Sequence, residues 1–211
     1  MSLFLAIENG TEFAATAAIG SIASAFAAGV YALVYARAAR RGWPFAVIAA
    51  TLVWAVVAAA SRTIAFTPLI LTLLVWAGLL VVVRLMPPVT ALAPSPPAAA
   101  WDLPARMVVA TALVVGVTSA APVLGPFASG MLAGFPVYAT VLAVFAQRAL
   151  GAEAGIAVMR GLTAGVFAFA TFFFVIASLL GTLGIATTFV LATIAIVLVQ
   201  AASFMLLRRS T

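Results

Sequence analysis

The stretch LILTLLVWAGLLVVV, residues 69–83, decides the fold class, because it runs for fifteen residues without a charge. A second stretch, IATTFVLATIAIVLV at residues 185–199, has the same character. Neither alternates apolar and polar residues, as the strands of an outer-membrane barrel do. Both approach the roughly 20 residues that a helix needs to cross the hydrocarbon of a bilayer. The sequence therefore predicts transmembrane helices.

The composition of the whole chain agrees with this prediction. Of 211 residues, 67% are hydrophobic and 7% are charged, whereas a soluble domain carries about 25% charged residues. The net charge of +6 comes from arginine alone, since there is no lysine. The arginines flank apolar runs and form no basic stripe with interleaved aromatics, so they indicate membrane topology. We expect the lipid bilayer as a partner and no nucleic acid.

The residue types that are missing exclude several classes of chemistry. The chain has no cysteine and no histidine, which excludes disulfides, thiolate catalysis and histidine-ligated metal or haem. Without lysine a retinal Schiff base is excluded too. The only carboxylates, Glu8, Glu12, Asp102 and Glu153, lie near or beyond helix ends and form no pair. We therefore expect a protein that is not an enzyme and has no cofactor and no metal.

The apolar runs predict an all-α polytopic bundle of seven transmembrane helices. The turn-forming stretches Arg40-Arg41-Gly42, Ser61-Arg62-Thr63, Leu124-Gly125-Pro126, 151–153 and 181–184 separate these helices. The second and the last of them are short, so we expect helices two and three, and six and seven, to form antiparallel hairpins. The seven predicted spans are 13–36, 44–60, 64–85, 105–123, 127–145, 155–180 and 183–207.

Arginine placement predicts the orientation of these spans. With seven spans, one side of the membrane collects eight arginines (37, 40, 41, 84, 106, 148, 208 and 209) and the other side only Arg62. Because basic residues accumulate in cytoplasmic loops, we expect the N-terminus outside and the C-terminus inside. The alanine-rich, lysine-free composition is typical of GC-rich bacterial genomes, so we expect a multi-pass protein of the bacterial cytoplasmic (inner) membrane.

A proline-rich segment at 87–104 divides the chain. It holds six of the eleven prolines, and such a run favours extended polyproline II over helix. We expect an N-terminal three-helix half at 1–86, a cytoplasmic linker at 87–104 and a C-terminal four-helix half at 105–211. The likeness of Val30-Tyr31-Ala32 to Val137-Tyr138-Ala139 suggests a parallel internal repeat of helices one to three in helices five to seven.

Arg160 is the first candidate site residue, because it lies about five residues into the sixth predicted span. A charge there is costly in hydrocarbon. It could coordinate an anionic solute in an internal cavity, or its long side chain could reach the cytoplasmic interface. The sequence leaves both interpretations open.

Pro136 is the second candidate, in Gly134-Phe135-Pro136-Val137-Tyr138. Proline removes a helical hydrogen bond, so with Gly134 it should kink or unwind the fifth helix. The break could be a simple packing kink, or it could form a solute site, because broken helices in transporters expose backbone dipoles to solutes. In the second case Tyr138 and Thr140 could add hydroxyls. We predict Arg160, Pro136, Tyr138, Gly134 and Thr140 as substrate-binding residues, lining two levels of one pathway.

Two GxxxG pairs, Gly130 with Gly134 and Gly161 with Gly165, predict close helix packing. Because a chain of this size leaves little bundle to enclose a path, we expect a homodimer that uses these faces. Two functions follow. One is a small transporter or channel of the permease type for a small, possibly anionic solute. The other is a non-catalytic membrane subunit or scaffold that binds another membrane protein through its glycine faces.

Residues 129–173 resemble the GlpM-like family of small bacterial integral membrane proteins. The resemblance rests on Ser129-Gly130-Met131-Leu132-Ala133-Gly134-Phe135-Pro136, Gly151, Met159-Arg160-Gly161 and Gly165. It covers under a quarter of the chain. It implies an integral membrane protein of the permease type, without enzymatic activity, and implies no particular substrate.

Overall fold

The computed structural model describes residues 11–61, 67–90, 104–105, 107–112, 115, 127, 131–132 and 134–209, with side chains to residue 201. These residues form helices and connecting segments, and none of them lies in a strand. The elements are α2 (Thr11–Ala38), the short 3-10 helix η1 (Ala39–Arg41), α3 (Trp43–Ser61), α4 (Pro68–Leu85), α7 (Val137–Leu150) and α8 (Ala152–Arg209). The all-helical fold class is confirmed.

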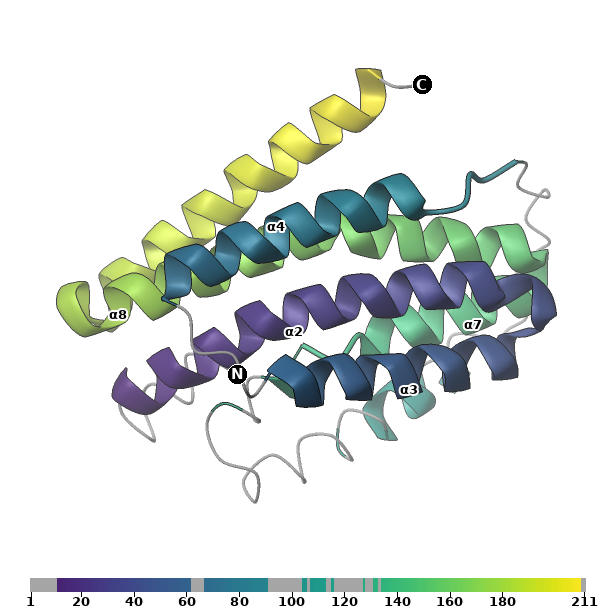
Figure 1. Cartoon of the computed structure of the whole chain (residues 1–211), viewed down its shortest axis with the longest axis horizontal. Coiled ribbons are helices and arrows are strands. Elements are labelled where there is room, and N and C mark those ends of the chain that lie inside the picture. Colours follow the sequence, from purple (N-terminus) through teal and green to yellow (C-terminus); the bar gives the residue numbers. More distant parts are fainter. Residues whose placement is uncertain are drawn as a thin grey trace.

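Helix α2 is the centre of the bundle, and α3 and α4 lie on different sides of it (Figure 1). Its buried surface consists mainly of alanine, glycine and serine, and such small residues let helix backbones approach closely. The side chain of Leu79 on α4 fills the space beside Gly29, and that of Phe26 on α2 lies against Gly78. A side chain at either glycine would collide with its neighbour.

The outer faces of α3 and α4 are apolar and exposed. On α3 the exposed side chains include Ile48, Leu52 and Val56, spaced four residues apart along one face. A soluble protein rarely exposes a continuous apolar stripe of this kind. Four helices of the described part are long and apolar enough to cross a membrane, by length and composition: α2 with η1, α3, α4 and α8. The chain is therefore a membrane protein of the helical type.

Several predicted spans are present with shifted ends. Helices α2 and α3 cover the spans predicted over 13–36 and 44–60, and α4 covers the third from Pro68 onward. The described residues within 105–123, which are 105, 107–112 and 115, are helical, and the remainder of that span lies outside the described residues. The seven-span count therefore stays a prediction.

The span predicted over 127–145 is not one continuous helix, and its helical part extends further, to Leu150. Residues 134–136 are not helical, and α7 begins at Val137 and runs to Leu150. At 14 residues, α7 is shorter than the roughly 20 residues that cross a bilayer. The predicted interruption by Pro136 is present, and it divides this part of the chain completely.

Helix α8 bends back on itself at Gly184, where φ is +73°, a backbone conformation that only glycine adopts readily. The two arms pack together, with the rings of Phe172 and Phe189 6.0 Å apart between centroids, and Figure 1 shows the chain reversing direction there. The hairpin predicted for helices six and seven is confirmed. The hairpin predicted for helices two and three is confirmed only in its antiparallel direction: α3 and α4 run in opposite directions, but each packs mainly on α2.

The predicted halves form one bundle, because the most extensive contact between elements joins α2 to α8 across the proline-rich linker. Residues 91–103 of that linker lie outside the described residues. The internal repeat gains no support from the tyrosines that suggested it, since Tyr31 is fully buried and Tyr138 is 66% exposed. The internal repeat stays a prediction.

Candidate functional site

The interruption at Gly134-Phe135-Pro136 is closed by local hydrogen bonds. Gly134 N–H donates to Met131 O (3.2 Å), Phe135 N–H to Leu132 O (3.0 Å) and Val137 N–H to Phe135 O (2.8 Å). Pro136 has no N–H to donate and its ring clashes with the preceding turn, which favours a break in the helix here. The chain turns at this point and restarts as α7.

Ser24 fixes the interruption at mid-height of the bundle. Its hydroxyl donates to Met131 O at 2.8 Å, and a Cβ on Gly134 would collide with the Ser24 side chain. Ser24 lies near the middle of α2, which runs from Thr11 to Ala38. The interruption is therefore level with the middle of α2.

A partly open cavity of about 280 Å³ adjoins the interruption. Its wall is mainly apolar, and no charged side chain contributes to it. Gly165 leaves part of this space free, since a Cβ there would meet nothing within 4 Å. The first residues of α7 also face it, and no side chain caps that helix N-terminus. The lining residues are Ala28, Gly134, Phe135, Pro136, Val137, Tyr138, Ala139, Leu162, Gly165, Val166 and Phe169.

A series of buried hydrogen bonds joins α7 to α2. Thr140 Oγ1 lies 2.8 Å from both Pro136 O and Tyr31 Oη. Further along, Tyr35 Oη donates to Gln147 Oε1 (2.8 Å), and Gln147 Nε2 donates to Ala39 O (2.7 Å). We call this set, Tyr31, Thr140, Tyr35, Gln147 and the Ala39 carbonyl, the polar column.

Phe135 separates the cavity from the polar column. Its ring is edge-on to the Tyr31 ring, with 5.8 Å between ring centroids, and edge-on to the Trp54 ring, with 4.9 Å between centroids. Aromatic pairs favour this geometry. Phe135 also lines the cavity. The aromatic cluster of Tyr31, Trp54 and Phe135 is therefore the boundary between the apolar cavity and the hydrogen-bonded groups.

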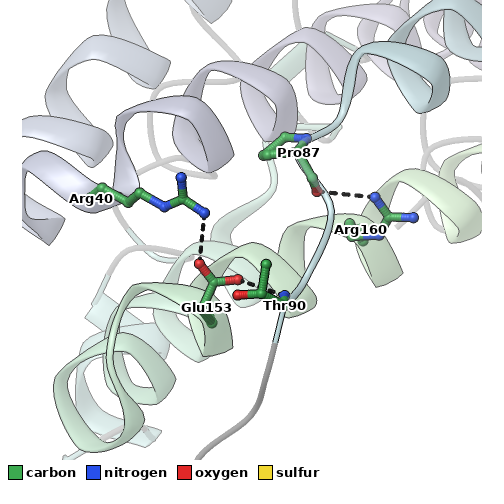
Figure 2. Close-up of polar contacts among 5 residues, drawn as sticks. All are labelled: Arg40, Pro87, Thr90, Glu153 and Arg160. Carbon is green, nitrogen blue, oxygen red and sulfur yellow. Dashed lines mark hydrogen bonds and ion pairs between the residues drawn. The ribbon is translucent and has the colours of Figure 1, made fainter.

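Arg160 lies outside the cavity. Its side chain is exposed, and Nη1 donates to the carbonyl of Pro87 at 3.1 Å (Figure 2). Arg37 Nη2 donates to O of Leu85, the last residue of α4 (3.2 Å). The two guanidinium groups, from α8 and α2, thus hold the end of α4 and the segment that follows it.

Glu153 holds the same segment from the start of α8. It accepts a hydrogen bond from Arg40 (2.9 Å) and one from Thr90 N–H (3.1 Å), as Figure 2 shows. Glu153 lies in the first turn of α8, ahead of the long uncharged stretch of that helix. The hydrogen bonds from Arg40 and from the Thr90 backbone lower the pKa of its carboxyl. With Gln147 and Ala39, these contacts place the ends of α2, α4 and α7 and the start of α8 together at one arginine-rich end.

The structure brings three of the five predicted site residues together. Gly134, Pro136 and Tyr138 line the cavity, with Tyr138 mostly exposed at its rim. Thr140 belongs to the polar column and Arg160 to the arginine-rich end, so the structure does not place Arg160 in one space with the interruption.

The sequence analysis did not predict Tyr31, Tyr35 or Gln147 as site residues. Two tyrosines four residues apart in an alanine-rich helix are a signal that could have found the first two, since they share one helix face. A glutamine close to the end of an apolar span could have found the third.

Comparison with known proteins adds no relative: no protein-family model, no curated protein and no solved structure matches this chain. The resemblance of residues 129–173 to the GlpM-like family therefore stays a prediction.

Proposed function

We propose that this protein is a small integral membrane transporter or channel of the permease type, with small anions as its preferred solutes. The observation that carries the proposal is the partly open cavity beside the helix interruption at Gly134–Pro136, level with the middle of the central helix. Non-helical backbone at this depth is tolerated where protein or a cavity surrounds it, and broken helices of this kind form solute sites in transporters.

The N-terminus of α7 supports the preference for anions. A helix N-terminus carries a partial positive charge of about +0.5, and the first three residues of α7 line the cavity. No acidic side chain lines it to repel an anion. At the arginine-rich end, Arg40, Arg41 and Arg148 would attract anions toward the bundle.

The proposal includes a location and an orientation. The chain is a seven-span protein of the bacterial cytoplasmic membrane, with its N-terminus outside and its arginine-rich end in the cytoplasm, as the positive-inside rule indicates. Reporter fusions at the two termini should be active on opposite sides of the membrane. Two termini on the same side would overturn the odd span count.

Solute flux into liposomes tests the transport proposal. The purified chain should let small anions such as chloride, nitrate or phosphate enter faster than they enter protein-free liposomes. Gly165→Leu should abolish this flux, because the new side chain would occupy the cavity without meeting an atom at its Cβ. Gly181→Leu is the matched control, since Gly181 on the same helix is equally free of neighbours but lies outside the cavity lining and outside the two GxxxG pairs. Equal rates of anion entry into liposomes with and without the protein would contradict the transport proposal.

A second candidate function, a membrane scaffold, is favoured by Gly161. A Cβ at Gly161 or Gly165 would meet nothing within 4 Å, so these glycines serve no close packing among the described residues. They remain free to pack against a helix of a second copy, the proposed homodimer, or of another membrane protein. Native mass measurement in lipid should then show a dimer that Gly161→Leu dissociates while flux is absent. If both the unaltered protein and the Gly161→Leu variant are monomers, the scaffold function is wrong.

A further inference from the structure

We infer that the interface between α2 and α7 is the inner part of the solute path, that the polar column lines it, and that α7 opens it. The inference rests on the proposed transport function and deepens it. It assigns Tyr31, Tyr35, Thr140 and Gln147 as solute-contacting groups for a small solute that accepts hydrogen bonds.

The polar column joins several buried side chains of two helices. Two other buried hydroxyls, those of Thr72 on α4 and Thr163 on α8, donate to the carbonyl four residues earlier in their own helix. Such bonds satisfy the hydroxyl and leave the neighbouring helix uninvolved. The hydroxyl of Ser24 makes a single bond to Met131 O. At the α2–α7 interface, the side chains instead bond from one helix to the other.

The column leads from the cavity to the arginine-rich end. Thr140 bonds to the Pro136 carbonyl at the interruption, and Gln147 bonds to the Ala39 carbonyl at the end of α2. Tyr31, Tyr35 and Ala39 follow at intervals of four residues, so they span about 12 Å at 1.5 Å per residue. The cavity and the column together therefore reach from the middle of the bundle to one of its ends.

The hydroxyl and amide groups of the column suit a solute that needs hydrogen-bond donors. Tyrosine and threonine hydroxyls and the glutamine amide can each donate to an anion as well as to one another. None of them is charged, so the solute would meet no fixed charge that traps it. The exposed Arg40 and Arg148 lie where the column reaches the surface.

Helix α7 has the form of a movable element. Non-helical residues bound it on both sides: Gly134–Pro136 before it, and Gly151, with φ of +87°, after it. Side chains as long as tyrosine and glutamine bridge it to α2, whereas the backbones of α2 and α8 approach each other closely along their length. Exchanging the bridging hydrogen bonds for bonds to water or solute would let α7 move away from α2 while the α2–α8 core stays packed.

Cysteine accessibility tests this inference without a known solute, because the chain has no cysteine of its own. Ala143 is fully buried on α7 and packs in one cluster with Tyr31 and Tyr35. Ala143→Cys should react with a membrane-impermeant maleimide applied at the arginine-rich end. Ala170→Cys is the matched control, since Ala170 is equally buried but lies in the α2–α4–α8 core, and it should not react. If Ala143→Cys fails to fold, Val144→Cys in the same cluster replaces it.

Removing the bridging hydrogen bonds should make α7 open more often. In the Ala143→Cys background, Gln147→Leu should raise the labelling rate about threefold to tenfold, the change expected from interhelical hydrogen bonds of ordinary strength in membranes. Equal, slow labelling of Cys at positions 143 and 170, unchanged by Gln147→Leu, would overturn the inference. If anion flux is observed together with this equal, slow labelling, the protein is a transporter but α7 does not open the path. Labelling without flux overturns the proposed function, and with it the assignment of this interface as a path.

Discussion

Tyr35 on α2 donates to Gln147 on α7, and Gln147 in turn donates to the carbonyl of Ala39, at 2.8 and 2.7 Å. One glutamine therefore bonds both to a side chain of α2 and to the first carbonyl of η1, directly after α2. This relationship ties α7 to α2, and it leads to the first prediction.

Tyr35→Phe and Gln147→Leu should each destabilise the protein, and their effects should not add. Interhelical hydrogen bonds in membranes contribute about 0.6 kcal/mol on average and about 1.7 kcal/mol at most. The coupling energy of the double-mutant cycle should lie in that range, measured by unfolding in mixed detergent micelles. Tyr35→Phe with Thr163→Val is the control pair, because Thr163 bonds only to its own helix. A coupling energy of zero for Tyr35 and Gln147 would contradict the hydrogen bond.

Gly134→Ala should destabilise the protein, since the added methyl group would collide with the side chain of Ser24. Overpacking of this kind costs about 1–3 kcal/mol. Ser24→Gly in the same chain should restore much of the loss by removing the colliding atoms. Gly165→Ala is the control and should be neutral, because nothing lies within 4 Å of its Cβ. A double variant no more stable than Gly134→Ala alone would show that the contact is not as described.

Arg160→Ala should loosen the segment after α4, because the hydrogen bond to Pro87 is lost. Trypsin should then cut faster after Arg84, which lies just before this segment in a chain without lysine. Arg148→Ala serves as control, since this exposed arginine makes no hydrogen bond to the described residues. Unchanged cleavage at Arg84 would show that Arg160 does not hold the segment.

The same variant separates the two interpretations of Arg160. Since its guanidinium lies outside the cavity lining, Arg160→Ala should keep most of the anion flux that Gly165→Leu removes. A loss of flux as complete as that of Gly165→Leu would indicate that Arg160 does contribute to the solute site.

The helical membrane fold could be predicted from sequence because apolar runs such as 69–83 admit little else. The bend at Gly184 fell within the predicted break at 181–184 for a similar reason, since glycines mark turns. The interruption at Pro136 was also predictable, because proline cannot donate the helical hydrogen bond.

What the sequence could not supply is the pairing of side chains between helices. Hydropathy fixes which residues lie in the membrane but not how each helix is rotated about its own axis. For this reason Thr140 was expected at the cavity, whereas it bonds to Tyr31. Arg160 was ambiguous for the same reason, because a guanidinium on a long side chain can reach either a cavity or a nearby carbonyl.

The most direct test of a path through the cavity and the α2–α7 interface is anion flux through Ala143→Cys before and after modification. In liposomes, a bulky impermeant maleimide on this cysteine should reduce flux to the protein-free rate. The cysteine-free chain and Ala170→Cys should be unaffected by the same treatment. Undiminished flux through fully modified Ala143→Cys would contradict the account.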